Sequence, residues 1–310
     1  MLCVTAPSFT VPSNYELSDL PVPAITEPTD VCIEVHAASV NPVDVKKASG
    51  VFKRVLKDEF PYMVGYDCAG VVKEVGDDVK KFKVGDEVYV RLPESHRGSW
   101  AEYATCPESY IASKPKMLNF EEAASLPLAA VTALQASRKY RGSLEGKTVF
   151  VPAGLIDYTK EEPTTVIPRG SVDFVFDTTG EAMRFLSLMT PSTSSIVSIS
   201  TLPSGTQLQG SSIMRRPDNP QMPWLEYLSL NLLDIVSKLR ARRWGVEYQY
   251  MFLEPDGEDL GEITNYVEEG LLRPVIGSTA DMKNLDSVRK VAGFVYDGKG
   301  GLGKSVIKVR

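Results

Sequence analysis

Val172-Asp-Phe-Val-Phe-Asp177, followed by Thr178-Thr-Gly180, is the stretch that decides the fold class. It is a short apolar run that ends in an aspartate and a turn, as buried strands of a parallel sheet do. Two similar runs flank it, Lys147-Thr-Val-Phe-Val-Pro-Ala-Gly154 before it and Ser195-Ile-Val-Ser-Ile-Ser200 after it. Short apolar strands that alternate with helical stretches predict a parallel α/β sheet in the middle of the chain.

The first 120 residues carry a β-rich pattern instead. Val31-Cys-Ile-Glu-Val-His-Ala37 alternates with period two, and Val64–Val75 is a second strand region. Gly-Asp turns at 76–78 and 85–86 separate short strands. Many short strands with frequent turns predict a small barrel-like domain. At Asn119, a good helix N-cap, the pattern becomes helical.

Beyond the central strands, the pattern predicts two helices and two strands. Trp224–Leu239 carries apolar residues along one helical face, which is usually buried in the helix's own domain, and Leu260–Glu269 is a second helix. Strands are expected over Val246–Leu253 and Ser305–Arg310. Residues 203–223 are rich in Pro, Gly, Ser and Gln, and we expect them to form a mobile loop.

Composition narrows the class of function. The net charge of −6 and the pI of about 5.2 argue against a nucleic-acid partner, which needs clustered positive charge. The cysteines contain no CxxC pair, which favours reduced thiols in the cytosol: Cys3, Cys32, Cys68 and Cys106. No apolar run reaches the roughly 18 residues of a membrane helix. The N-terminus lacks the basic region of a signal peptide. We therefore expect a cytoplasmic protein with a small-molecule substrate and no membrane partner.

Seven short segments follow one another along nearly the whole chain, and their order indicates a family more strongly than any one segment does. They are Ala37-Ala-Ser-Val-Asn-Pro-Val-Asp44, Gly65-Tyr-Asp-Cys-Ala-Gly-Val-Val72, Val84-Gly-Asp-Glu-Val88, Gly98-Ser-Trp-Ala-Glu-Tyr-Ala104, Leu126-Pro-Leu-Ala-Ala-Val-Thr-Ala133, Phe176-Asp-Thr-Thr-Gly180 and Glu269-Gly-Leu-Leu-Arg-Pro-Val275. Together they resemble the zinc-independent medium-chain dehydrogenase/reductase family, in its quinone oxidoreductase and enoyl reductase branch, and within it the fungal enoyl-reductase-like group.

The resemblance implies a fold and a reaction. A GroES-like β domain over residues 1–120, completed by about 271–310, would precede a Rossmann-like domain over 121–270, with the cofactor between them. This branch moves a hydride from a reduced nicotinamide to a conjugated C=C bond or a quinone. NADPH is the expected cofactor, with NADH not excluded, and a homodimer is possible because dimers are common in the family.

A metal is not expected. The zinc branch has a Cys ligand near residues 41–44 and a Gly-His-Glu in the next strand, where this chain has Asn41-Pro42 and Gly65-Tyr66-Asp67. Only two histidines, His36 and His96, occur in the chain, and a tetrahedral zinc needs converging Cys, His or carboxylate ligands.

The resemblance also implies roles for four residues outside the central strands. Asn41 would hydrogen-bond near the nicotinamide and the substrate, with a turn asparagine as the alternative. Tyr66 stands where the zinc branch has its His and could donate a proton or hydrogen bond to the substrate oxygen, although a packed core tyrosine fits the pattern better. Thr132 would contact the nicotinamide side of the cleft, or else bond its own helix backbone. Lys304 would approach the cofactor from the last turn.

The central strands contribute further candidates. Ala153 and Gly154 are the remainder of the dinucleotide turn. Four residues lie at the carboxyl ends of predicted parallel strands, where ligands gather in open sheets: Asp177, Thr178, Gly180 and Ser200. Asp177 could equally cap a helix.

The segment that should hold the dinucleotide is missing from this pattern. A strand, a Gly-rich turn, a helix and a second strand take roughly 30 residues. Only 19 residues, 153 to 171, separate the predicted strands at 148–152 and 172–177, and they contain no GxGxxG. The chain resembles a family member without a block between Leu155 and Ile156. A skipped exon or splice variant, a gene-model error and loss of residues from the chain explain this equally well.

Three hypotheses remain open from the sequence. The chain is an NAD(P)H-dependent reductase, a catalytically inactive relative that acts as a binding or scaffold protein, or a defective product that does not fold stably. One motif of the sequence suggests a different ligand. Gly298-Lys-Gly-Gly-Leu-Gly-Lys-Ser305 matches the P-loop pattern of nucleoside-triphosphate-binding proteins. Since Ser305 begins a predicted strand and no helix can follow, we do not expect it to bind a nucleoside triphosphate.

Overall fold

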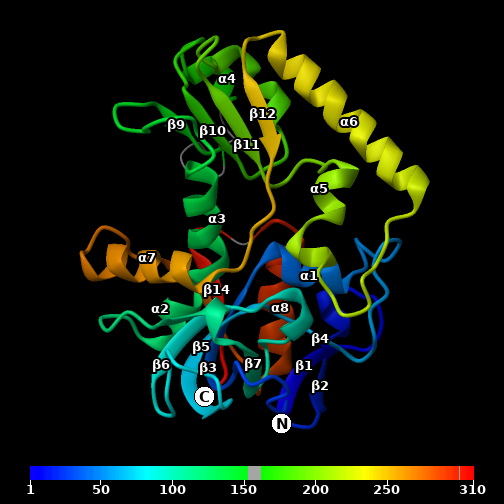
Figure 1. Cartoon of the computed structure of the whole chain (residues 1–310), viewed down its shortest axis with the longest axis vertical. Coiled ribbons are helices and arrows are strands. Elements are labelled where there is room, and N and C mark those ends of the chain that lie inside the picture. Colours follow the sequence, from blue (N-terminus) through cyan, green and yellow to red (C-terminus); the bar gives the residue numbers. More distant parts are fainter. Residues whose placement is uncertain (153–161, 300) are drawn as a thin grey trace. The chain divides into compact units, whose positions relative to one another are not determined.

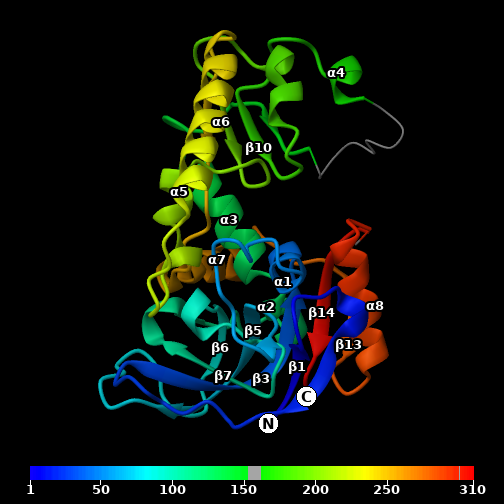
Figure 2. The same ribbon diagram turned by 90° about the vertical axis from the view of Figure 1, so that its right-hand side faces the viewer.

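The computed structural model describes residues 1–152, 162–299 and 301–310, which form two compact units. Unit 1 comprises Met1–Val131, Arg215–Asp218 and Pro255–Arg310, and unit 2 comprises Thr132–Met214 and Asn219–Glu254. Figures 1 and 2 label the elements of both. The chain therefore begins and ends in the same unit.

Unit 1 is built on a seven-stranded sheet in the order β13-β14-β3-β5-β6-β8, with β7 also paired to β3. Its strands are β3 (Asp30–Val40), β5 (Asp67–Val75), β6 (Glu87–Arg91), β7 (Tyr103–Pro107), β8 (Ile111–Ser113), β13 (Ile276–Asp281) and β14 (Lys304–Lys308). The predicted closing strand is confirmed as β14, which pairs antiparallel with β3 so that Ser305 lies opposite Val40. This pairing brings the end of the chain to the end of β3.

A second, smaller sheet and four helices complete unit 1. The small sheet has the order β2 (Glu16–Asp19), β1 (Leu2–Ala6), β4 (Tyr62–Met63). The helices are α1 (Pro42–Ala48), α2 (Phe120–Ala124), α7 (Gly257–Glu268) and α8 (Leu285–Tyr296), and short 3₁₀ turns cover Pro12–Asn14, Glu94–His96 and Glu108–Tyr110. Asn119 caps α2 as predicted, since its side chain accepts a hydrogen bond from the Glu122 amide at 2.8 Å.

The core of unit 1 is aliphatic with a few large aromatic side chains. Trp100 and Tyr15 are fully buried there, and the Trp100 indole N–H donates to the Ser39 carbonyl at 3.0 Å. All four cysteines of the chain lie in this unit and are buried as free thiols.

Unit 2 contains a four-stranded, wholly parallel sheet. The order is β12 (Glu247–Tyr250), β11 (Ser195–Ser198), β10 (Phe174–Asp177), β9 (Val149–Phe150). The predicted parallel α/β sheet is confirmed, and strands adjacent in the chain are adjacent in space. Within the described residues, no strand pairs with the outer edge of β9, where Val149 is 40% exposed.

The helices of unit 2 differ from expectation at two places. α3 (Pro127–Ser137) leads into the unit, followed by α4 (Pro163–Val166), α5 (Gly205–Gln209) and α6 (Trp224–Arg242), with 3₁₀ turns at Ala182–Arg184, Leu186–Leu188 and Ser212–Met214. The prediction of a loop over 203–223 is wrong for α5, because Ser204 and Gln207 form a capping box that starts a helix.

The second difference concerns the apolar face of α6. Burial in its own domain is the commoner case for such a face, and a binding or scaffold role is the alternative; here its large apolar residues are exposed, while Asp234 and Ala241 are the buried positions. The helix itself is where the periodicity placed it, so the pattern identified the helix and not the side that it buries.

Candidate functional site

A buried polar centre lies where β3 ends and α1 begins in unit 1. Asn41 is the N-cap of α1, and its backbone N–H donates to Asp44 Oδ2 at 2.6 Å. The Asn41 side-chain amide donates to Asp67 Oδ2, at the start of β5, at 2.9 Å. Ser39 Oγ donates to the same oxygen at 3.1 Å, and Lys304 Nζ donates to Asn41 Oδ1. Strands β3, β5 and β14 thus bring together residues that are 263 positions apart.

Two carboxyl groups and one ammonium group set the electrostatics of this polar centre. Burial, reinforced by the Asp67 carboxylate, raises the pKa of Asp44 to about 8. Burial lowers the pKa of Lys304, while the Asp67 and Asp44 carboxylates oppose that shift. Oδ1 of Asp44 and Oδ1 of Asp67 have no hydrogen-bond partner among the described residues. Asp44 therefore holds its proton at neutral pH, and the centre has spare acceptor and donor capacity.

Tyr66 lies in a different buried network of unit 1. Its hydroxyl donates to Glu94 Oε2 at 2.7 Å, and Glu94 also pairs with Lys47. The Arg91 guanidinium stacks over the Tyr66 ring, 4.4 Å from the ring centroid. Burial raises the pKa of the Tyr66 hydroxyl well above its usual value. The hydroxyl proton is thus committed to a carboxylate, which is the environment of a packed core tyrosine.

Asp177 organises the strand-end residues of unit 2. Its Oδ1 accepts from the backbone N–H groups of Thr179 at 3.1 Å and Gly180 at 3.0 Å, and its Oδ2 accepts from Ser198 Oγ at 2.7 Å. Ser200 Oγ donates to the Thr178 carbonyl at 2.7 Å. Gly180 has φ of +86°, which a side chain would strain. The four predicted residues come together, but their polar groups largely bond one another as a capped turn does.

Thr132, Ala153 and Gly154 are the remaining residues that the sequence predicted for the site. Thr132 lies within α3 and is buried. Ala153 and Gly154, predicted as the dinucleotide turn, lie outside the described residues. The connection from β9 to β10 is described from residue 162 onward, and there it forms only α4, a single helical turn of four residues.

A pocket of about 360 Å³ opens at the carboxyl ends of β9 and β10. It is lined by Pro152, Glu162, Pro163, Thr179, Glu181, Arg184 and Phe185. Arg184 pairs with Glu162 at 2.6 Å and with Glu181, so two carboxylates surround one guanidinium. The resulting local charge is negative and unfavourable for a pyrophosphate.

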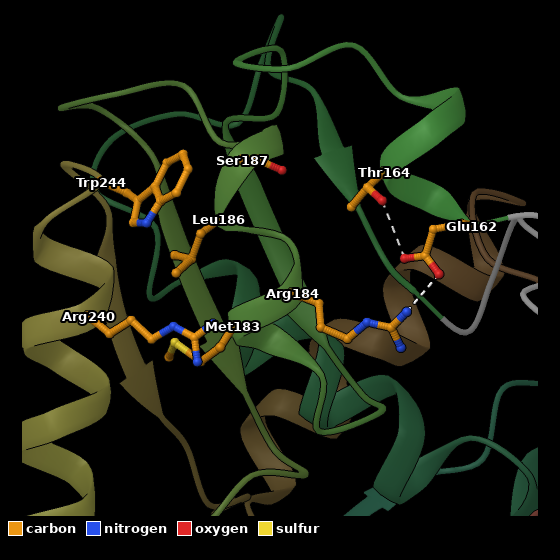
Figure 3. Close-up of a pocket in the computed structure, with 8 residues that line it drawn as sticks. All are labelled: Glu162, Thr164, Met183, Arg184, Leu186, Ser187, Arg240 and Trp244. Carbon is orange, nitrogen blue, oxygen red and sulfur yellow. Dashed lines mark hydrogen bonds and ion pairs between the residues drawn. The ribbon is translucent and has the colours of Figure 1, made fainter.

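A second pocket, also of about 360 Å³, adjoins the first through Glu162 and Arg184. Figure 3 shows Arg184 reaching Glu162 on one side, while Arg240 of α6 and Trp244, which follows that helix, line the other. Sequence reasoning missed both pockets, because Arg184 and Glu162 belong to no motif and meet only through the fold.

The described part of unit 2 does not fit a dinucleotide held in the Rossmann manner. That mode requires a helix N-terminus for the pyrophosphate and a second strand beside the first. The edge of β9 has no such neighbour among the described residues, and the described part of the connection from β9 to β10 forms only α4. The described part of unit 2 therefore offers no site from which a dinucleotide could transfer a hydride.

The described residues contain no site of two further kinds, a metal site and a membrane-spanning helix. No group of three or more His, Cys, Asp or Glu side chains there is placed to hold a metal ion. In the same residues, no helix combines the length and the apolar character needed to cross a membrane.

Comparison with known proteins defines the class. Residues 27–116 match the family described as alcohol dehydrogenase GroES-like domain, and residues 153–288 match the family described as zinc-binding dehydrogenase. A GroES-like unit joined to a Rossmann-like parallel sheet is a dehydrogenase/reductase architecture. The chain belongs to the medium-chain dehydrogenase/reductase family.

Named relatives are reductases and oxidoreductases. A 2-methylene-furan-3-one reductase of Solanum lycopersicum is 44% identical over 44% of this chain and 36% of the relative. The mitochondrial NAD(P)H oxidoreductase RTN4IP1 of Homo sapiens is 38% identical over 42% of this chain and 37% of the relative. The chain thus spans little more than a third of these relatives' length. A quinone oxidoreductase from Coxiella burnetii shares the fold, with a TM-score of 0.77 and 24% identity over 100% of this chain and 99% of that one.

A longer alignment bears on the missing block. The mitochondrial reticulon-4-interacting protein 1 of Caenorhabditis elegans is 25% identical over 96% of this chain and 92% of the relative. That alignment is 351 positions long and this chain has 310 residues, so at least 41 positions hold no residue of this chain.

Proposed function

We propose that the protein is a reductase-type member of its family, whose reaction is NAD(P)H-dependent reduction of a conjugated C=C bond or a quinone. The named relatives support this class of substrate and cofactor. The single structural feature that supports it is the buried polar centre of Asn41, Asp67 and Lys304 at the end of β3. NADPH is our preferred cofactor, and NADH is the alternative.

The residues of this polar centre have defined capacities. Lys304 and the Asn41 amide are hydrogen-bond donors of the kind that stabilise a carbonyl or enolate oxygen. Asp67 accepts from both Asn41 and Ser39, and this fixes the orientation of the Asn41 amide. Asp44 accepts from the Asn41 backbone and is neutral at pH 7, so it adds no second negative charge beside the donors.

A second candidate function is ligand binding without turnover. The short β9-to-β10 connection favours it, since it leaves the described part of unit 2 without a pyrophosphate site. In that case unit 1 would still bind a small conjugated carbonyl compound or quinone at the polar centre. We propose a cytoplasmic location for this chain, in contrast to a relative that is named as mitochondrial.

One experiment separates the two candidates. The purified protein is first weighed intact, and the same sample is then titrated by calorimetry with NADPH and with NADH. If the mass matches 310 residues and a nucleotide binds at micromolar concentration, reduction of cyclohexenone and of a quinone is assayed next. If neither nucleotide binds at millimolar concentration, the reductase proposal fails for this chain and binding alone remains.

A matched pair of variants tests the polar centre. Asn41→Ala should weaken cyclohexenone binding at least tenfold, since it removes the donor and the contact with Lys304. Asn14→Ala is the control, because Asn14 is an exposed asparagine of the same unit whose side-chain amide donates to Thr10 Oγ1, away from the polar centre. Equal binding by both variants would place the ligand elsewhere. A single cooperative melt of the wild-type chain would argue against the third hypothesis, a product that does not fold stably.

A further inference from the structure

Helix α6 turns the apolar side of its surface toward solvent. Figure 1 shows the helix along the outer side of unit 2, beyond β12 and α5. Its large apolar residues, which we call the apolar row, are 48–69% exposed: Trp224, Leu225, Leu228, Leu232, Leu233, Ile235, Val236 and Leu239. Single exposed apolar residues are common on proteins, but a contiguous apolar surface along a whole helix marks a place that contacts another body.

The polar side of α6 faces inward and fixes the orientation of the helix. Tyr227 OH and Thr206 Oγ1 of α5 lie 2.9 Å apart, and Asn231 Oδ1 accepts from the Thr206 backbone N–H at 3.2 Å. Asp234 is buried and accepts from Lys238 Nζ at 2.7 Å. Rotating the helix to bury the apolar row would break these contacts. The apolar row is therefore a built feature of unit 2.

The form of α6 suits a helix that lies on a lipid surface. Its 19 residues span roughly 28 Å, and such a helix buries its apolar side about 5–10 Å deep at the boundary of headgroups and acyl chains. The expectation of no membrane partner rests on the absence of an apolar run long enough to span a bilayer. A helix that lies on the surface needs no such run.

Three arginines end the apolar row. Arg240, Arg242 and Arg243 are exposed, and no carboxylate of the described residues pairs with them. At about 100° per residue, Arg243 lies in line with Leu232, while Arg240 and Arg242 lie on opposite edges of the row. The helix dipole favours a cation at this end, but it amounts to only about half a charge. The positive charge is thus left for an anionic partner.

The position of these cations follows from how α6 is packed. A cation on the inward side of its first turns would lie against α5, so the end of the helix is where cations can reach a partner that also contacts the apolar row. A pocket of about 360 Å³ adjoins this end, and Figure 3 shows Arg240 and Trp244 lining it. It offers a recess for a lipid headgroup.

Two tryptophans stand at the ends of the helix. Trp224 is its first residue and Trp244 follows its last turn, and they are 69% and 51% exposed. Tryptophan favours the headgroup level of a bilayer, because its ring is apolar and its N–H is a hydrogen-bond donor. The apolar row is therefore bracketed by side chains suited to that depth.

We propose that α6 docks unit 2 on an anionic lipid surface. The apolar row enters the boundary between headgroups and acyl chains, while Arg240, Arg242 and Arg243 bind the phosphates and carboxylates of the lipids. Apolar burial supplies attraction to any bilayer, and the arginines select an anionic one. The proposal is independent of whether the chain binds a nucleotide.

Vesicle flotation of the full chain tests the apolar part of the proposal. We expect the chain to float with phosphatidylcholine vesicles that contain about 30% phosphatidylserine. Leu232→Glu should lower the affinity for these vesicles about tenfold or more. Leu202→Glu is the matched control, because Leu202 is a leucine of the same unit, 60% exposed against 62% for Leu232, and lies outside α6. No flotation of the wild type at millimolar lipid, or equal affinity of the two variants, would overturn the proposal.

Charge reversal tests the arginines. Each cation near an anionic surface contributes about fivefold to binding, so Arg242→Glu combined with Arg243→Glu should lower the affinity by about twentyfold or more. Lys80→Glu combined with Lys81→Glu is the control, since these neighbouring exposed lysines of unit 1 give the same change in net charge. An equal loss in both double variants, or equal flotation of the wild type with pure phosphatidylcholine vesicles, would show that α6 does not select the lipid.

Tryptophan quenching tests which surface meets the lipid. The chain has three tryptophans, and Trp100 is fully buried in unit 1. Brominated acyl chains in the anionic vesicles should therefore quench Trp224 and Trp244 and spare Trp100. We expect quenching in the wild type and none when both exposed tryptophans are replaced by Phe. Absence of quenching in bound wild type, or quenching that persists in the double variant, would place the lipid contact away from α6 and overturn the proposal.

Discussion

Replacing Asp177 is the sharpest test of whether the strand ends of unit 2 hold a turn or a ligand. The carboxylate accepts six hydrogen bonds, from Thr179 N and Oγ1, Gly180 N, Glu181 N, Ala182 N and Ser198 Oγ. Thr179 and Glu181 are exposed and can bond water after the change, but Ala182 and Ser198 are buried. Each buried donor left without a partner costs about 1–3 kcal/mol. We therefore expect Asp177→Ala to lower the free energy of unfolding of unit 2 by about 2–5 kcal/mol.

The assay must report on unit 2. Tryptophan fluorescence does not serve, because Trp224 and Trp244 are already 69% and 51% exposed. Amide hydrogen exchange of peptides from β10 and β11 measures the opening free energy directly. Asp173→Ala is the control, since Asp173 accepts one backbone N–H, from Thr148, and we expect a loss of about 1 kcal/mol. An unchanged opening free energy in Asp177→Ala, together with lost nucleotide affinity, would refute the capping role and make Asp177 a ligand contact.

Three further predictions concern unit 1. Because the pKa of Asp44 is raised to about 8, this group stabilises the fold fully below about pH 4, and the contribution is lost as the pH rises through 8. Asp44→Asn should therefore flatten the pH dependence of the melting temperature between about pH 4 and pH 8. Glu94→Gln leaves the buried Lys47 ammonium without its carboxylate and should cost about 3–5 kcal/mol in urea unfolding followed by Trp100 fluorescence, and a loss below 1 kcal/mol would contradict this. Gly65→Ala would place a Cβ 2.2 Å from Trp100 Cδ1 at a φ of +101°, so thermal unfolding should show that the free energy of unfolding falls by more than about 3 kcal/mol. Gly85→Ala is the control, because Gly85 has a φ of +93° but open space around it, and its free energy of unfolding should fall by only about 1 kcal/mol.

The sequence predicted strands well wherever one local pattern determined them. The alternation at 31–37 and the apolar runs ending at Asp177 and Ser200 mark β3, β10 and β11, because burial of one or both faces of a strand leaves a local trace. The role of Asp177 was left open between ligand contact and cap, and the hydrogen bonds of the structure describe a cap.

Features that depend on contacts between distant segments could not be predicted in the same way. The Lys304 contact with Asn41 joins residues at opposite ends of the chain, and no local pattern records it. The side that α6 buries could not be predicted for a related reason. Periodicity identifies an apolar face, but whether that face turns inward depends on Thr206 and Asn231, which bond the polar side.

The placement of the thiols means that thiol reagents can report on the unfolding of unit 1 but not on that of unit 2. All four cysteines lie in unit 1, and burial raises the pKa of Cys3 and of Cys32 to about 11 and also raises the pKa of Cys68 and of Cys106. A thiolate reacts and a buried thiol does not. The rate at which a maleimide or disulfide reagent modifies the native protein therefore measures the opening of unit 1 alone. Unit 2 can unfold and refold without any change in that rate.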